Sequence, residues 1–286
     1  MNNPNKNIYI TFLSILIFIG SNLSAHGQSE IPDNLTELQS AIEGILSDSE
    51  TPAIGIALVN SDRTTWVAGI GKANIENNIS ADVNTMFRIG SVSKMFVSLA
   101  ILKLQEEGLV DLKDKVRDLV PEVEFTNPWE GTNPILVEQL LEHTTGWDDW
   151  HLTEYALNDD KPLTLKEGLD FHPHSRTSRW VPGTRFAYCN AGPAVAAYIV
   201  QKVSGVKFED YIQNHFFKHL GMTTATFFES ETYKQLGATL YINSNPVDYW
   251  HIIMRPSGAI NASANDMVKL VQFFTNRGKI DSVQLI

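Results

Sequence analysis

A serine and a lysine three residues apart are the feature of this sequence most able to do chemistry. Ser91 and Lys94 lie in the run from Phe87 to Phe96. If a helix begins here, a spacing of three places both side chains on the same face. An amine beside a serine hydroxyl can take its proton and make the oxygen a nucleophile. Ser93 cannot share a face with Lys94, because adjacent helix positions diverge by about 100°.

The residues that follow Ser91 indicate the helix that this pairing needs. Apolar residues recur at helical spacing from Val92 to Leu104, and Gly108 is expected to end the helix. Ser91 then lies in the first turn, where unpaired backbone N–H groups and the positive end of the helix dipole favour a developing oxyanion. Taken alone, Ser91 is better explained as an N-cap.

A second motif lies further along the chain. Pro182 and Gly183 indicate a turn, and the short extended stretch after it contains Tyr188 and Asn190. Side chains two apart in an extended segment point the same way, so both are expected to face one cleft. Cys189 between them is the only cysteine. It is expected to point into the core and not to act as a nucleophile.

Both short patterns also occur where no role is expected. Ser204 and Lys207 repeat the first spacing, but Gly205 between them is expected to end a helix. Tyr241 and Asn243 repeat the second pattern without the turn before it or the helix after it. The two motifs are therefore informative only together and in order.

In that order, Ser91-x-x-Lys94 and Tyr188-x-Asn190 make the sequence resemble the serine β-lactamase and penicillin-binding-protein superfamily. Within it, the sequence is most similar to the branch related to class C β-lactamases. Three further landmarks follow the family order, namely Leu140 to Gly146, Leu220 to Met222 and Pro256 to Asp266. The resemblance covers nearly the whole chain after residue 30.

This resemblance implies a role for each motif residue. Ser91 would be the acylated nucleophile, and Lys94 would accept or shuttle its proton. Tyr188 would act as a phenolate-type general base and later protonate the leaving group. Asn190 would bind the amide carbonyl of the substrate or orient Lys94.

The implied function is a serine hydrolase without metal or cofactor that cleaves an amide or ester. Its substrate would be a small molecule or peptide: a β-lactam, a D-Ala-D-Ala-type peptide or a small ester. A carboxylesterase of the same fold is an alternative. His151, His172 and His174 do not form a His-Glu-x-x-His helix, so no metal site is expected. His143 is expected to anchor the turn that follows it.

One element of the family pattern is not found. The family carries a third motif, Lys-Thr-Gly or His-x-Gly, after the tyrosine, and neither follows Tyr188. A helix that begins near a Ser263-x-x-Asp266 capping pattern is expected to end at Gly278, where the closing strands of the family would follow. The chain is therefore expected to be C-terminally truncated. This leaves two further alternatives, a protein that binds a β-lactam or peptidoglycan without turnover, and an inactive fragment.

The fold implied by the resemblance is α+β. An antiparallel sheet flanked by helices would accompany a mostly helical lobe at approximately residues 95–255, with the closing C-terminal strands missing. Asp33 is expected to cap a first helix, and Ala53 to Val59 and Thr64 to Gly71 are expected to form a hairpin. The loop-rich stretch from Trp147 to Arg179 is expected to overhang the cleft.

The N-terminal residues indicate export. Residues 1–27 contain one basic residue, Lys6, then an apolar run from Ile8 to Gly20 and small residues. This run is short for a membrane span, which needs roughly 20 residues, so residues 1–27 are interpreted as a signal peptide. Residues 28–286 would then form an incomplete hydrolase domain that is periplasmic or secreted, without stable membrane association. A net charge of −11 argues against nucleic acid as a partner, and the oligomeric state stays open.

Overall fold

The structure is a computed structural model that describes residues 34–60, 63–149, 155–157, 162–171, 173–280 and 283–286. It divides into two units, Met1–Ile45 and Leu46–Ile286. The signal peptide predicted at residues 1–27 lies outside the described residues, as do Trp150, His151 and His172. No helix among those that are described is long and apolar enough to cross a membrane.

The first unit contributes most of helix α2 (Leu35–Asp48). The Asn34 side chain begins this helix, because its Oδ1 accepts hydrogen bonds from the backbone N–H groups of Thr36 and Glu37, each over 3.0 Å. Asp33, the residue predicted to cap this helix, lies outside the described residues.

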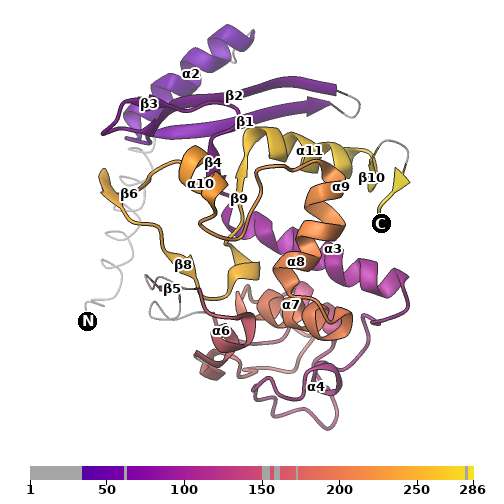
Figure 1. Cartoon of the computed structure of the whole chain (residues 1–286). Helices are drawn as coiled ribbons and strands as arrows, with labels where there is room; N and C mark the ends of the chain where they lie inside the picture. Colours follow the sequence, from indigo (N-terminus) through magenta and orange to yellow (C-terminus); the bar gives the residue numbers. More distant parts are fainter. Residues whose placement is uncertain (1–33, 61–62, 150–154, 158–161, 172, 281–282) are drawn as a thin grey trace, which may run out of the picture. The chain divides into compact units, whose positions relative to one another are not determined.

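The second unit contains the predicted hairpin. Strands β1 (Ala53–Asn60) and β2 (Arg63–Asn74) pair antiparallel, and β3 (Ile79–Ser80) extends the sheet in the order β1-β2-β3. Helix α11 (Ala264–Thr275) contacts both long strands and runs alongside β1 in Figure 1. Its buried residues are Ala264, Asp266, Val268, Leu270 and Phe273.

A short strand leads directly into the helix that carries Lys94. Strand β4 (Met86–Arg88) pairs antiparallel with β9 (Asn261–Ser263). It continues through the 3-10 turn η1 (Gly90–Val92) into α3 (Ser93–Glu106). The buried positions of α3 recur at helical spacing and include Phe96, Ala100 and Leu104. The helix ends before Gly108, as predicted, and this glycine has a φ of 71°.

Helices pack around α3 to form the core. Helix α7 (Ala191–Ser204) contacts α3, α5 (Val137–Leu141), α6 (Leu165–Phe171) and α8 (Phe208–Ile212), and its first ten residues are all buried. A π-helical turn η4 (Gln213–Phe217) joins α8 to α9 (Lys218–Leu220). The rings of Phe216 and Phe217 pack edge-on against Phe96, with centroids 6.4 and 5.1 Å away.

Short elements complete the second unit. They are α4 (Val116–Leu119), η3 (Pro173–Ser175), α10 (Glu231–Leu236), η5 (Arg255–Ser257) and the paired strands β5 (Ala156–Leu157) with β8 (His251–Ile252), β6 (Leu240–Ile242) with β7 (Asn245–Val247), and β10 (Lys279–Ile280) with β11 (Val283–Gln284). The fold is therefore α+β, with helices and small antiparallel sheets, as the sequence predicts.

The structure describes only part of the stretch expected to overhang the cleft. Trp147, which begins the stretch expected to overhang the cleft, is fully buried. Its ring packs against Phe125, with centroids 5.6 Å apart. Trp147 belongs to the hydrophobic core. Residues 150–154, 158–161 and 172 lie outside the described residues, so the expectation for the stretch as a whole stays a prediction.

Candidate active site

Ser91 lies at the junction between strand β4 and helix α3. The chain turns there through Gly90, whose φ of 54° falls in the left-handed region that glycine adopts without strain. The turn is fixed to the strand pair, since the N–H of Ile89 donates to the carbonyl oxygen of Ile260 over 2.9 Å. Ser91 itself is exposed. The residue is therefore accessible on a well-supported turn.

Two proton-carrying groups contact the Ser91 hydroxyl. Lys94 Nζ donates to Ser91 Oγ over 3.0 Å, and the Tyr188 hydroxyl donates to the same oxygen over 2.8 Å. The Lys94 ammonium also lies 5.0 Å from the centroid of the Tyr188 ring. The structure thus brings Ser91, Lys94 and Tyr188 together, although Tyr188 comes from a distant part of the chain.

A backbone carbonyl oxygen also orients the Lys94 amine. Lys94 Nζ donates to the carbonyl oxygen of Ser257 over 2.5 Å. The Ser257 side chain is buried and its Oγ donates to the carbonyl oxygen of Asn190 over 2.6 Å. Ser257 therefore connects α3 to the start of α7. Sequence reasoning marked this stretch only as a landmark, because a backbone acceptor leaves no signal in residue type.

His143 supports the segment that presents Tyr188. Its ring lies against the Tyr188 ring, with centroids 4.4 Å apart and an interplanar angle of 30°. Its Nδ1 accepts a hydrogen bond from the backbone N–H of Cys189 over 3.3 Å. Burial and then the nearby Lys94 charge lower the pKa of His143, which keeps the ring neutral. A neutral ring retains the acceptor that this backbone contact requires.

Asn190 contacts a carboxylate that the sequence motifs do not reveal. Its Nδ2 and its backbone N–H both donate to Asp149 Oδ1, over 2.8 and 3.1 Å. No hydrogen bond joins the Asn190 side chain to Lys94 within the described residues. Asp149 lies in a loop without a recognisable pattern, so only the folded chain identifies it as part of the site.

The side chain of Cys189 points away from this group. Cys189 is fully buried, whereas Tyr188 before it is 42% exposed. Burial raises the pKa of the Cys189 thiol, which disfavours the reactive thiolate. The expectation that this cysteine packs in the core is confirmed.

The described part of the chain contains no group of three or more His, Cys, Asp or Glu side chains that could hold a metal ion. The described site residues supply a hydroxyl with an amine and a phenol in contact with it. Such a group can form and break an ester with an acyl substrate.

A protein-family model described as Beta-lactamase matches residues 38–284. The chain belongs to the beta-lactamase family. The solved octameric penicillin-binding protein homologue from Pyrococcus abyssi is similar, with a TM-score of 0.75 and 27% identity over 86% of this chain and 57% of that chain. A class C beta-lactamase solved in complex with cefoxitin shares the fold, with a TM-score of 0.72 and 21% identity over 87% of this chain and 66% of that chain.

Two curated relatives of this beta-lactamase-family chain are bacterial. Protein flp of Staphylococcus aureus (strain MW2) is 27% identical over 85% of this chain and 49% of its own length. The putative penicillin-binding protein PbpX of Bacillus subtilis (strain 168) is 32% identical over 71% of this chain and 50% of its own length. The chain thus spans about half the length of the curated relatives it matches. These similarities place it in the serine β-lactamase and penicillin-binding-protein superfamily.

Proposed function

We propose that this protein is a metal-independent serine hydrolase of the class C β-lactamase-related branch, which cleaves an amide or ester through an acyl-enzyme on Ser91. The observation that carries this proposal is the convergence of Lys94 Nζ and the Tyr188 hydroxyl on Ser91 Oγ, at 3.0 and 2.8 Å. Both distances are those of direct hydrogen bonds, so either group can exchange a proton with Ser91 without an intervening water.

In the acylation step, Ser91 Oγ attacks the substrate carbonyl carbon while its proton passes to Tyr188. In this step Tyr188 acts as a phenolate, and the Lys94 amine lies beside it, hydrogen-bonded to Ser91 Oγ and 5.0 Å from the centroid of the Tyr188 ring. The C–N or C–O bond of the substrate then breaks, and Tyr188 returns the proton to the leaving amine or alcohol. Water next attacks the acyl carbon, the acid is released and Ser91 regains its proton.

The substrate proposed is a β-lactam, a D-Ala-D-Ala-type peptide or a small ester. All three carry an acyl carbon bonded to a leaving nitrogen or oxygen, and the same three side chains serve each of them. We propose that Asn190, held by Asp149, supplies the side-chain amide that contacts the substrate beside Ser91.

A labelling experiment tests this proposal. The full chain would be incubated with a fluorescent penicillin and, separately, with a fluorophosphonate that reacts with activated serines. We expect covalent labelling of the wild type and none of Ser91→Ala. Ser204→Ala is the matched control, because Ser204 and Lys207 have the same spacing but Ser204 donates its hydroxyl to the Val200 carbonyl oxygen within its own helix.

The persistence of the label separates turnover from trapping. A penicillin label that decays while free acid accumulates supports a hydrolase, whereas a label that persists supports a protein that is acylated without turnover. Equal labelling of Ser91→Ala and wild type by both probes contradicts the assignment of the nucleophile.

A further inference from the structure

A buried ion pair lies directly before the turn that contacts Lys94. Arg255 begins η5, and Ser257, whose carbonyl oxygen accepts from Lys94, ends it. Arg255 and Glu209 are only 4% and 7% exposed. Arg255 Nε and Nη2 each lie 2.7 Å from Glu209 Oε1. A charge buried this deeply is stable only with a well-placed partner, so this pair holds Arg255 in one position.

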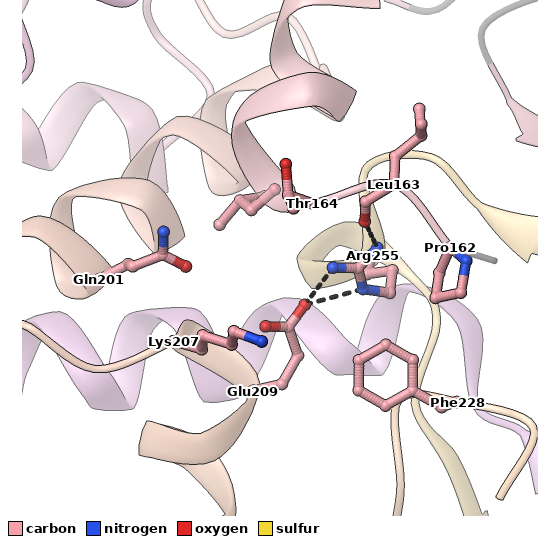
Figure 2. A pocket seen from close by; sticks show the side chains of 9 residues that line it. Pro162, Leu163, Thr164, Gln201, Lys207, Glu209, Phe228 and Arg255 are labelled. Carbon is pink, nitrogen blue, oxygen red and sulfur yellow. Dashed lines mark hydrogen bonds and ion pairs between the residues drawn. The ribbon is translucent and has the colours of Figure 1, made fainter.

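The guanidinium of Arg255 connects several distant segments. Glu209 belongs to α8, and Arg255 Nη1 donates to the carbonyl oxygen of Leu163, which precedes α6. The guanidinium carbon also lies 5.1 Å from the centroid of the Phe228 ring. Figure 2 shows these groups around Arg255, with dashed lines to Glu209 and Leu163. Arg255 is therefore fixed by elements outside η5.

Backbone hydrogen bonds in η5 fix the position of Ser257 relative to Arg255. The carbonyl oxygen of Arg255 accepts from the N–H groups of Gly258 and Ala259, over 3.1 and 2.9 Å, and the N–H of Ser257 donates to the Met254 carbonyl oxygen over 3.0 Å. A turn closed by these bonds moves as a unit. A displacement of Arg255 therefore displaces the Ser257 carbonyl oxygen, which lies 2.5 Å from Lys94 Nζ.

We propose that the Arg255–Glu209 ion pair is a positioning element for Lys94, which holds the Ser257 carbonyl oxygen where it directs the Lys94 amine toward Ser91. The inference rests on the proposed function, because it concerns the reactivity of Ser91. Arg255 touches Lys94 only through Ser257, so it acts by geometry. A misplacement of about 1 Å in a reacting group can slow a reaction on the order of 100-fold.

A cavity beside the ion pair makes this proposal directly testable. Its volume is about 190 Å³, and Arg255, Glu209, Lys207, Gln201 and Phe228 are among its lining residues. Figure 2 shows the side chains of Glu209 and Phe228 next to Arg255. If Arg255 is shortened to alanine, a free guanidinium ion can enter from this cavity and pair with Glu209.

The experiment measures the rate at which the fluorophosphonate labels Ser91 in the full chain. We expect Arg255→Ala to react about 10- to 100-fold more slowly than wild type. Guanidinium chloride, added far below the concentrations that unfold proteins, should restore part of the rate, whereas sodium chloride should not. Val116→Ala is the control for lost stability, because Val116 is fully buried in α4 and is not a lining residue of this cavity.

A conservative variant keeps the test decisive if Arg255→Ala does not fold. Glu209→Gln keeps an acceptor oxygen for Arg255 and removes the charge of the pair. Because Arg255 still occupies its place in this variant, added guanidinium ion cannot replace the lost charge of Glu209. We therefore expect Ser91 to be labelled more slowly in Glu209→Gln than in wild type, without rescue by guanidinium, and Val116→Ala to keep the wild-type rate.

The possible outcomes distinguish the two proposals. A wild type that is not labelled at Ser91 contradicts the proposed function itself. If wild type is labelled, two results contradict only the positioning role. One is that Arg255→Ala is labelled at the wild-type rate. The other is that Arg255→Ala is labelled more slowly and guanidinium does not change its rate. Labelling of folded Glu209→Gln at the wild-type rate also contradicts it.

Discussion

At the scale of single residues, the site depends on groups that hold the catalytic candidates as much as on the candidates themselves. The Lys94 amine is shared between Ser91 Oγ and the Ser257 carbonyl oxygen. The backbone N–H next to Tyr188, that of Cys189, donates to His143. Preorganised contacts of this kind reduce the reorganisation needed when the reaction begins.

His143 gives a prediction about acid pH. Its pKa is lowered, so the neutral ring persists until the pH falls below the ordinary value of 6.5, and protonation then removes the Nδ1 acceptor for the Cys189 N–H. We expect Ser91 labelling to slow as the pH decreases through this range. His143→Asn keeps an acceptor without titrating, and asparagine tolerates the φ of 58° at this position.

The measurement is the rate of Ser91 labelling as a function of pH in wild type and in His143→Asn. The acid limb of the labelling profile should be shallower in His143→Asn than in wild type, while the rate at neutral pH should fall several-fold because the ring packed on Tyr188 is lost. Superimposable acid limbs would show that His143 does not control the position of Tyr188.

At the scale of elements, β4 and β9 carry the framework of the site. Met86 pairs with Ser263 at one end, and Arg88 pairs with Asn261 at the other, immediately before the turn to Ser91. Ser263 also begins α11, the helix that contacts the β1 and β2 hairpin. The start of α11 therefore connects the hairpin to the strand that positions Ser91.

The capping box of α11 is a specific target for a stability measurement. Ser263 Oγ accepts from the N–H of Asp266, and Asp266 Oδ2 accepts from the N–H of Ser263, each over 3.2 Å. We expect Ser263→Ala to lower the free energy of unfolding in urea by about 1 kcal/mol. Thr275→Ala, at the exposed far end of the same helix, should change it by less than about 0.5 kcal/mol. Equal effects would contradict a specific role for the cap.

Local sequence pattern was sufficient to predict several of the secondary-structure elements. The alternating hairpin, the Ser263 and Asp266 capping pair and the helix after Ser91 were all predicted, because each depends on residues near one another in the sequence. The structure differs from the prediction at Ser91. This residue lies in the 3-10 turn that precedes α3, and not in the α-helix itself. The spacing of three still brings Lys94 to Ser91, since this turn continues directly into the helix.

Contacts between residues far apart in the sequence could not be predicted from local sequence pattern. Asp149 reaches Asn190, and Glu209 pairs with Arg255, across separations that no periodicity records. The burial of Trp147 against Phe125 was also not predicted. The motif residues could be found because the proposed chemistry requires particular residue types. The residues that hold them in place can be of many types, and only the folded structure identifies them.

At the scale of the whole molecule, half-buried histidines couple folding to pH. Burial lowers the pKa of His143, His215 and His251 below the ordinary value of 6.5. The unfolded chain therefore binds more protons than the folded protein once the pH falls below about 6.5. Stability is fully present above this pH and is lost progressively as the pH decreases toward the lowered values.

Urea unfolding at several pH values measures this coupling. We expect the midpoint to be constant from pH 8 to 7 and to decrease from about pH 6.5 downward, with a nearly constant slope of free energy against urea. Replacing His251 by Gln, which cannot become charged, should weaken the decrease. A midpoint that rises on acidification would contradict the neutral, half-buried state of these rings.

The most direct test of the account is whether the phenol of Tyr188 activates Ser91. The measurement is the rate of fluorophosphonate labelling of Ser91, located by mass spectrometry, in wild type and Tyr188→Phe. Phenylalanine keeps the ring that packs on His143 and removes only the hydroxyl that lies 2.8 Å from Ser91 Oγ. We expect labelling of Ser91 to slow by about 100-fold or more in this variant. Labelling of Tyr188→Phe at the wild-type rate would contradict the account.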